Sequence, residues 1–110
     1  MKNAHQFIVS LLQNKDVTID QSLLHQALTH KSYAVETTGI MRHNQRLEFL
    51  GDSVLGLIIA NQLYLDHTNF DEAQLTLWKI SLVREETLFD VAKEIDLDKH
   101  ILIGKGEDRK

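Results

Sequence analysis

Two carboxylates, Glu48 and Asp52, lie four residues apart in a segment that is otherwise mostly apolar. On a helix this spacing places both side chains on one face, with about 5–6 Å between their Cβ atoms. Like charges so placed repel each other, which weakens the helix slightly. Mg²⁺ prefers oxygen ligands, and it keeps several waters beside one or two carboxylates. The pair therefore has two possible interpretations: it is half of a two-metal site, or it is part of a solvated helix face.

Gln45 extends this polar stripe, because it precedes Glu48 by three residues on the same predicted helix. Glu72 falls near the start of a later predicted helix, where the helix dipole alone favours a negative charge. The sequence has no Cys, no His-Glu-x-x-His pattern and no Gly-rich phosphate loop. Thiolate metal sites, zinc-protease chemistry and an organic cofactor held on such a loop are therefore not expected.

Composition indicates a small globular domain without a membrane span. The chain has 110 residues, 43% of them hydrophobic, and a formal net charge of −4. Its N-terminus lacks the apolar core of a signal peptide, and the longest apolar run covers only residues 54–60. We therefore expect a cytoplasmic protein. The acidic charge lowers the expectation of nucleic-acid binding, although bound divalent cations would change that balance locally.

The apolar pattern predicts an all-α domain. Helices are expected over residues 4–12, from an N-cap at Asp20 to about residue 28, over 44–64, and from Asp71 to about residue 95. Residues 30–43 read as a long loop, and 101–103 as a short strand or extended tail. The helix over 44–64 is apolar around more than half its circumference, so we expect it to be central, with Trp78 in the core. Gly51, inside that helix, predicts that something packs very close to it.

Four segments together resemble the endonuclease domain of the bacterial ribonuclease III family. Residues 44–55, Asn-Gln-Arg-Leu-Glu-Phe-Leu-Gly-Asp-Ser-Val-Leu, are similar to the family's signature. Residues 26–33 resemble the segment before it, and residues 81–88 the segment after it. Residues 102–107, Leu-Ile-Gly-Lys-Gly-Glu, resemble the stretch that leads to the family's last catalytic helix. The matches occur in family order across nearly the whole chain.

The resemblance implies a homodimeric endoribonuclease that cleaves double-stranded RNA, as in the processing of ribosomal and messenger RNA precursors. It implies Mg²⁺ as the cofactor, with Mn²⁺ as a substitute, held by Glu48 and Asp52 as the metal-binding and catalytic residues. Gln45 and Glu72 match accessory positions that assist RNA handling. Phe49 matches an aromatic residue that inserts into the partner subunit. Hydrolysis would leave a 5′-phosphate and a 3′-hydroxyl.

Two departures from the family pattern bear on activity. Gln45 stands where the family often has Glu. The family has a second acidic pair, an Asp followed three residues later by a Glu, and this pair has no counterpart in residues 1–110. The double-stranded-RNA-binding domain of the family has no counterpart in residues 1–110 either. We therefore expect residues 1–110 to be the first three quarters of the catalytic domain, inactive or weak alone. The alternative is a catalytically inactive module that dimerises or binds RNA.

Overall fold

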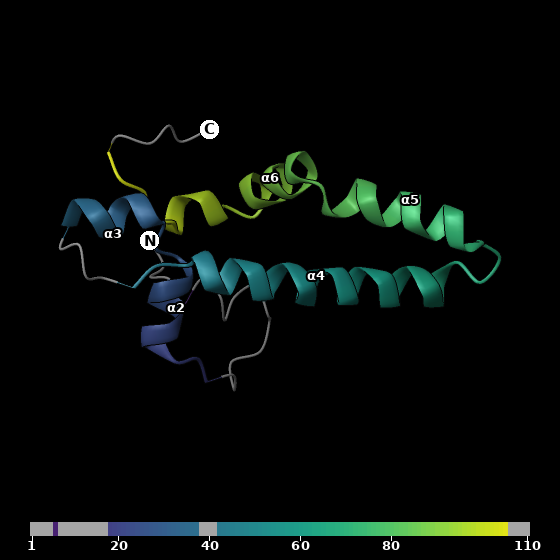
Figure 1. The fold of residues 1–110 in the computed structure, drawn as a ribbon, viewed down its shortest axis with the longest axis horizontal. Coiled ribbons are helices and arrows are strands. Elements are labelled where there is room, and N and C mark those ends of the chain that lie inside the picture. The colour runs from purple at the N-terminus through teal and green to yellow at the C-terminus, as the bar shows by residue number, and fades with distance from the viewer. Residues whose placement is uncertain (1–5, 7–17, 38–41, 106–110) are drawn as a thin grey trace. The chain divides into compact units, whose positions relative to one another are not determined.

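The computed structural model describes residues 6, 18–37 and 42–105, and the predicted helix over 4–12 lies almost wholly outside them. The expected all-α class is confirmed, because the regular elements of the described residues are all helical (Figure 1). The chain divides into two compact units, residues 1–47 with 100–110, and residues 48–99. The elements are α2 (Gln21–Ala27), α3 (Lys31–Thr37), α4 (Gln45–Asp66), α5 (Glu72–Val83), α6 (Glu85–Glu94) and the 3₁₀ helix η1 (Leu97–His100).

The first unit is built around Thr29, which is fully buried. Its hydroxyl donates to the carbonyl of His25 at 2.6 Å, and its own carbonyl accepts from the backbone N–H of Asn44 at 3.0 Å. Leu102 pairs with this segment as an isolated β-bridge, so the expected extended tail forms there. Buried backbone groups need hydrogen-bond partners. These bonds therefore hold three segments together: the end of α2, the tail at Leu102, and Asn44, the residue before α4.

The predicted loop over 30–43 was wrong in its first half, where α3 forms. The Nδ1 atom of His30 accepts from the backbone N–H of Ser32 at 3.1 Å and so satisfies one free donor of the first turn. The helix has seven residues, and Ala34 is its only buried side chain. Because so short a helix carries no apolar stripe, periodicity could not reveal it.

Gly104 holds the tail against α3 by close backbone approach. Its N–H donates to the Ser32 hydroxyl at 2.9 Å, and the N–H of Lys105 donates to Glu36 Oε1 at 3.1 Å. A Cβ on Gly104 would lie 2.9 Å from the Ser32 carbonyl carbon and would overlap the Glu36 carboxylate. The position therefore has no room for a side chain.

We expect Gly104→Ala to lower the free energy of unfolding by about 1–3 kcal/mol, because the tail must move away and both hydrogen bonds weaken. Urea denaturation measures the change. Gly56→Ala is the matched control, since a Cβ there would meet only the Lys79 side chain, at 3.6 Å. It should be neutral or stabilising by up to about 1 kcal/mol. Equal effects of the two variants would contradict the close contact at Gly104.

The second unit contains the α4–α5 hairpin followed by α6 (Figure 1). The expected helix over 44–64 is confirmed as α4, and Asp71 caps α5. In this capping box the Asp71 carboxylate accepts from the N–H of Gln74 at 2.9 Å, and the Gln74 side chain accepts from the N–H of Asp71 at 3.0 Å. Arg84, with ψ 156, is extended and separates α5 from α6.

Three packing expectations for this unit were wrong within the described residues: the core position of Trp78, the central place of the helix over 44–64, and the close packing at Gly51. Trp78 is 50% exposed, and it stacks with His67 and Phe70 at ring-centroid distances of 6.2 Å rather than entering a core. The helix α4 has Leu63 as its only buried residue. No described atom comes within 4 Å of the Cβ position of Gly51. The chain described here therefore leaves most of the apolar surface of α4 uncovered.

Candidate functional site

Glu48 and Asp52 lie in the first two turns of α4, and both side chains are exposed. Their spacing within one regular helix puts them on the same face, as the sequence predicted. Within residues 42–105, neither carboxylate has an ion pair or a side-chain hydrogen bond. Two adjacent carboxylates without a protein cation between them leave uncompensated negative charge that a bound cation would neutralise.

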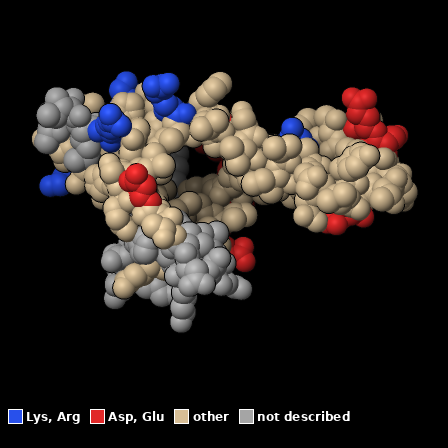
Figure 2. Space-filling model, turned by 90° about the horizontal axis from the view of Figure 1, so that it is seen from below, with Lys and Arg blue, Asp and Glu red and all other residues tan. Residues whose placement is uncertain are grey.

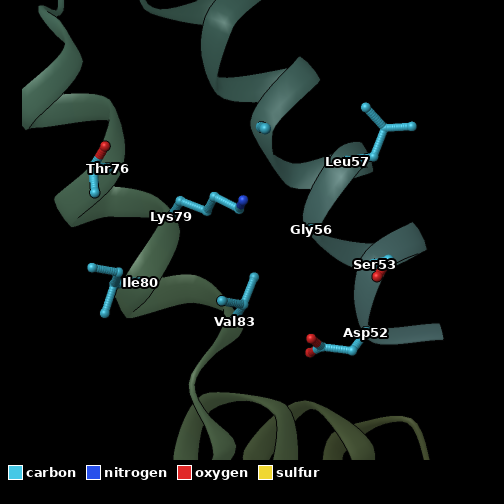
Figure 3. Close-up of a pocket in the computed structure, with 9 residues that line it drawn as sticks. Asp52, Ser53, Gly56, Leu57, Thr76, Lys79, Ile80 and Val83 are labelled. Atoms are coloured by element: carbon cyan, nitrogen blue, oxygen red, sulfur yellow. The ribbon is translucent and has the colours of Figure 1, made fainter. Parts of the chain in front are cut away.

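Asp52 lines a pocket of about 650 Å³ between α4 and α5 (Figure 3). Its carboxylate points toward Val83 at the end of α5, and the Lys79 side chain extends from α5 toward Gly56 on α4. The pocket is partly apolar and partly polar, and it lies wholly within residues 48–99. Its walls are Asp52, Ser53, Gly56, Leu57 and Ala60 from α4 with Thr76, Lys79, Ile80 and Val83 from α5.

The donor chemistry of this pair fits a hard divalent cation. Both side chains offer carboxylate oxygens, and both are exposed on one face. Mg²⁺ is commonly bound by one or two carboxylates, with waters and substrate phosphates completing its octahedron. Among the described residues no group of three or more His, Cys, Asp or Glu side chains could hold a metal ion. Glu48 and Asp52 alone could therefore supply only part of a ligand set, and their role as metal ligands stays a prediction.

Of the other predicted site residues, Gln45 is exposed at the start of α4, three residues before Glu48 and therefore on the same face of the helix. Glu72 begins α5, eleven residues before Val83, which lines the pocket together with Asp52. That separation corresponds to about 16 Å along the helix axis. Phe49 is 80% exposed, which suits a side chain that contacts another molecule.

Lys79 is a pocket residue that the sequence analysis did not single out. It is half-buried and is the only Lys or Arg side chain among the pocket's lining residues. The signal was present, because Lys79 interrupts the expected inner face of α5 between Leu75 and Leu82. A cation on an inner face is unusual unless it has a partner. Only the antiparallel pairing of α4 and α5, which periodicity cannot give, places it beside Asp52.

Comparison with known proteins gives consistent matches. A family described as Ribonuclease-III-like matches residues 20–110. "Ribonuclease 3" of Corynebacterium glutamicum is 48% identical over 97 residues, which cover 88% of this chain and 39% of that protein. "Ribonuclease 3" of Natranaerobius thermophilus is 45% identical over 101 residues, covering 92% of this chain and 44% of the relative. The chain thus spans about two fifths of the length of these curated relatives.

Solved structures give the same result. The nuclease domain of ribonuclease III from Campylobacter jejuni superposes with a TM-score of 0.76 at 33% identity, covering 97% of this chain and 67% of that one. A second structure of that domain has a TM-score of 0.77 at 31% identity, with 93% of this chain and 66% of that one covered. It was described for structural flexibility in the region involved in dimer formation.

Proposed function

The chain belongs to the ribonuclease-III-like family, and on that premise we propose that it carries part of the catalytic centre of a divalent-metal-dependent endonuclease for double-stranded RNA. One observation carries the proposal. Glu48 and Asp52 lie on one face of α4, inside the segment that resembles the family signature, and within residues 42–105 neither carboxylate has an ion pair. The named relatives, each called Ribonuclease 3, support an endoribonuclease.

In this proposal Glu48 and Asp52 hold Mg²⁺ through their carboxylate oxygens, and Asp52 orients it toward the pocket between α4 and α5. A bound Mg²⁺ supplies Lewis acidity, which makes water a stronger nucleophile and neutralises charge on the scissile phosphate. Mn²⁺ has the same charge and accepts the same oxygen ligands, so it should substitute. Gln45 and Glu72 are proposed to assist RNA handling, since both side chains are exposed.

We further propose a homodimer in which Phe49 contacts the partner subunit. An exposed apolar surface on α4 supports association with another molecule, because Leu50, Val54, Ile58 and Leu65, which share one face of the helix, are 49–59% exposed. Figure 2 shows that the viewed surface of the α4–α5 hairpin carries few charged side chains. Contiguous exposed apolar surface of this kind marks interaction sites. The open Cβ position of Gly51 is consistent with a neighbour supplied by another molecule.

Within residues 6, 18–37 and 42–105, no helix has the length and apolar character needed to cross a lipid bilayer. Cytoplasmic localisation stays a prediction.

The test is cation-dependent cleavage by the protein expressed from its natural gene. With a synthetic RNA duplex and Mg²⁺, we expect fragments that carry a 5′-phosphate. EDTA should abolish cleavage, and added Mg²⁺ or Mn²⁺ should restore it, because within residues 42–105 the carboxylate pair has no Lys or Arg partner that could replace the metal. Gel analysis of end-labelled duplex measures the products, and the same strands unpaired are the control.

Two results would contradict this function. Cleavage that continues in EDTA would exclude a metal-dependent centre at Glu48 and Asp52. Duplex binding without cleavage in Mg²⁺ would instead favour a catalytically inactive RNA-binding module, the alternative suggested by the partial ligand set and by Gln45.

A further inference from the structure

Lys79 differs from the other cations of the second compact unit. Residues 48–99 contain eleven acidic and only four basic side chains. Arg84 approaches Glu86 at 3.9 Å, Lys99 pairs with Asp96 at 3.2 Å, and Lys93 lies 5.2 Å from the centre of the Phe89 ring. Within residues 42–105, Lys79 alone among the four has no carboxylate, hydrogen-bond or ring partner. Because acidic side chains outnumber basic ones in this unit, the Lys79 ammonium without a partner among residues 42–105 is a candidate binding group for an anionic ligand.

The local packing holds this ammonium in the pocket. The side chain crosses from α5 toward α4 at Gly56, as Figure 3 shows. Both Cε and Nζ of Lys79 lie 3.6 Å from the Cβ position of Gly56, an ordinary van der Waals distance, so the end of the lysine side chain lies against α4 at this glycine. The residue is half-buried, although a lysine on a two-helix hairpin could extend into solvent. The geometry therefore keeps the charge beside α4, close to one helical turn beyond Asp52.

The charges in the pocket favour a phosphate group bound to a cation over a free anion. An ammonium in a partly desolvated pocket attracts an anion more strongly than it would in bulk water. A free anion would meet repulsion from Asp52, which lines the same pocket. A phosphodiester bound at a divalent cation on Asp52 meets no such repulsion, because the cation neutralises the carboxylate. Lysine is a common phosphate-binding residue that acts as a point charge.

We propose that Lys79 binds a non-bridging phosphate oxygen of RNA in the α4–α5 pocket, beside the cation held by Asp52. This inference rests on the proposed function. It adds a substrate contact made by α5, whereas the carboxylate pair lies on α4. In a unit with so few cations, Lys79 provides a local positive charge that partly offsets the acidic surface, at Gly56, one helical turn along α4 from Asp52.

Binding is tested in the Asp52→Asn background, in which cleavage is suppressed and the repelling charge is absent. RNA-duplex affinity is measured over a series of salt concentrations for this variant alone and combined with Lys79→Met or Lys93→Met. Loss of one phosphate contact should lower the slope of log K against log salt by about one for Lys79→Met. Lys93→Met removes the same charge from the same unit outside the pocket, so its slope should not change.

Cleavage is tested with Asp52 intact. Lys79→Met should slow single-turnover cleavage at least about tenfold, because a charged hydrogen bond to phosphate is lost, and Lys79→Arg should restore most of the rate. Thermal unfolding of each variant shows whether the fold persists. If Lys79→Met fails to fold, Lys79→Gln takes its place in the same measurements, because it removes the charge but keeps a polar end group in the half-buried pocket, and the proposal again requires the lower slope.

The outcomes separate this inference from the proposed function. If Lys79→Met and Lys93→Met show the same salt slope and rate, the phosphate contact is overturned even where Asp52→Asn has abolished cleavage. The contact is equally overturned if Lys79→Arg folds but behaves as Lys79→Met does. If Asp52→Asn leaves cleavage intact, the proposed metal-dependent function fails, whatever Lys79 does.

Discussion

Asp52→Asn should reduce cleavage of double-stranded RNA by about a thousandfold or more while the protein still binds the duplex. The side chain keeps its shape and remains on α4, but it loses the negative charge that would hold a cation in the proposed site. Metal ions contribute several kcal/mol of charge stabilisation in phosphoryl chemistry, and about 4 kcal/mol corresponds to a thousandfold in rate. Because Asp52 is exposed and, within residues 42–105, has neither an ion pair nor a side-chain hydrogen bond, folding should be unaffected. Single-turnover cleavage and duplex affinity measure the two effects separately.

Asp90→Asn is the matched control, because it makes the same chemical change at an exposed position of α6. It should cleave at the parental rate. If Asp52→Asn retained more than about a tenth of the parental rate, Asp52 could not be a ligand whose charge is needed for the reaction. If Asp52→Asn instead lost duplex binding and stability together, the residue would be structural, which its exposure does not suggest.

The sequence predicted the long elements because their apolar periodicity is strong. The helix over 44–64 spans six turns, and the Asp71 cap of α5 follows directly from its residue type and its Gln74 partner. Shorter features escaped prediction. The helix α3 depends on a histidine cap and one buried alanine, neither of which leaves a periodic trace. Trp78 was assigned to a core, yet it forms a half-exposed stack with neighbouring rings.

The site was predictable to the extent that it is local. Glu48 and Asp52 share a helix face by spacing alone, and the resemblance then gave them a role. Lys79 could not be placed by the same means, because its presence in the same pocket as Asp52 depends on how α5 lies relative to α4. The distance of Glu72 from the pair likewise follows from the antiparallel hairpin. Contacts between elements are the information that single-sequence periodicity does not contain.

Phe49 differs from Glu48 and Asp52, because its proposed role is in assembly. It lies between Glu48 and Leu50 on α4 with 80% of its surface exposed, an unusual environment for so large an apolar side chain. A symmetric dimer would use this surface twice, since an isologous interface repeats every contact. One substitution therefore removes two buried rings. Burial of a phenylalanine is worth about 1.5–3 kcal/mol, so the dimer would lose about 4 kcal/mol.

Phe49→Ala should therefore weaken dimerisation by about a thousandfold, measured as the dissociation constant by sedimentation equilibrium. Leu77→Ala is the control, because Leu77 is a similarly exposed apolar residue on α5. It should leave the dissociation constant nearly unchanged. Cleavage by Phe49→Ala should fall at low protein concentration and recover at high concentration, since Glu48 and Asp52 are intact in each subunit. An unchanged dissociation constant would place the dimer interface elsewhere, and the apolar surface of α4 would then need another occupant.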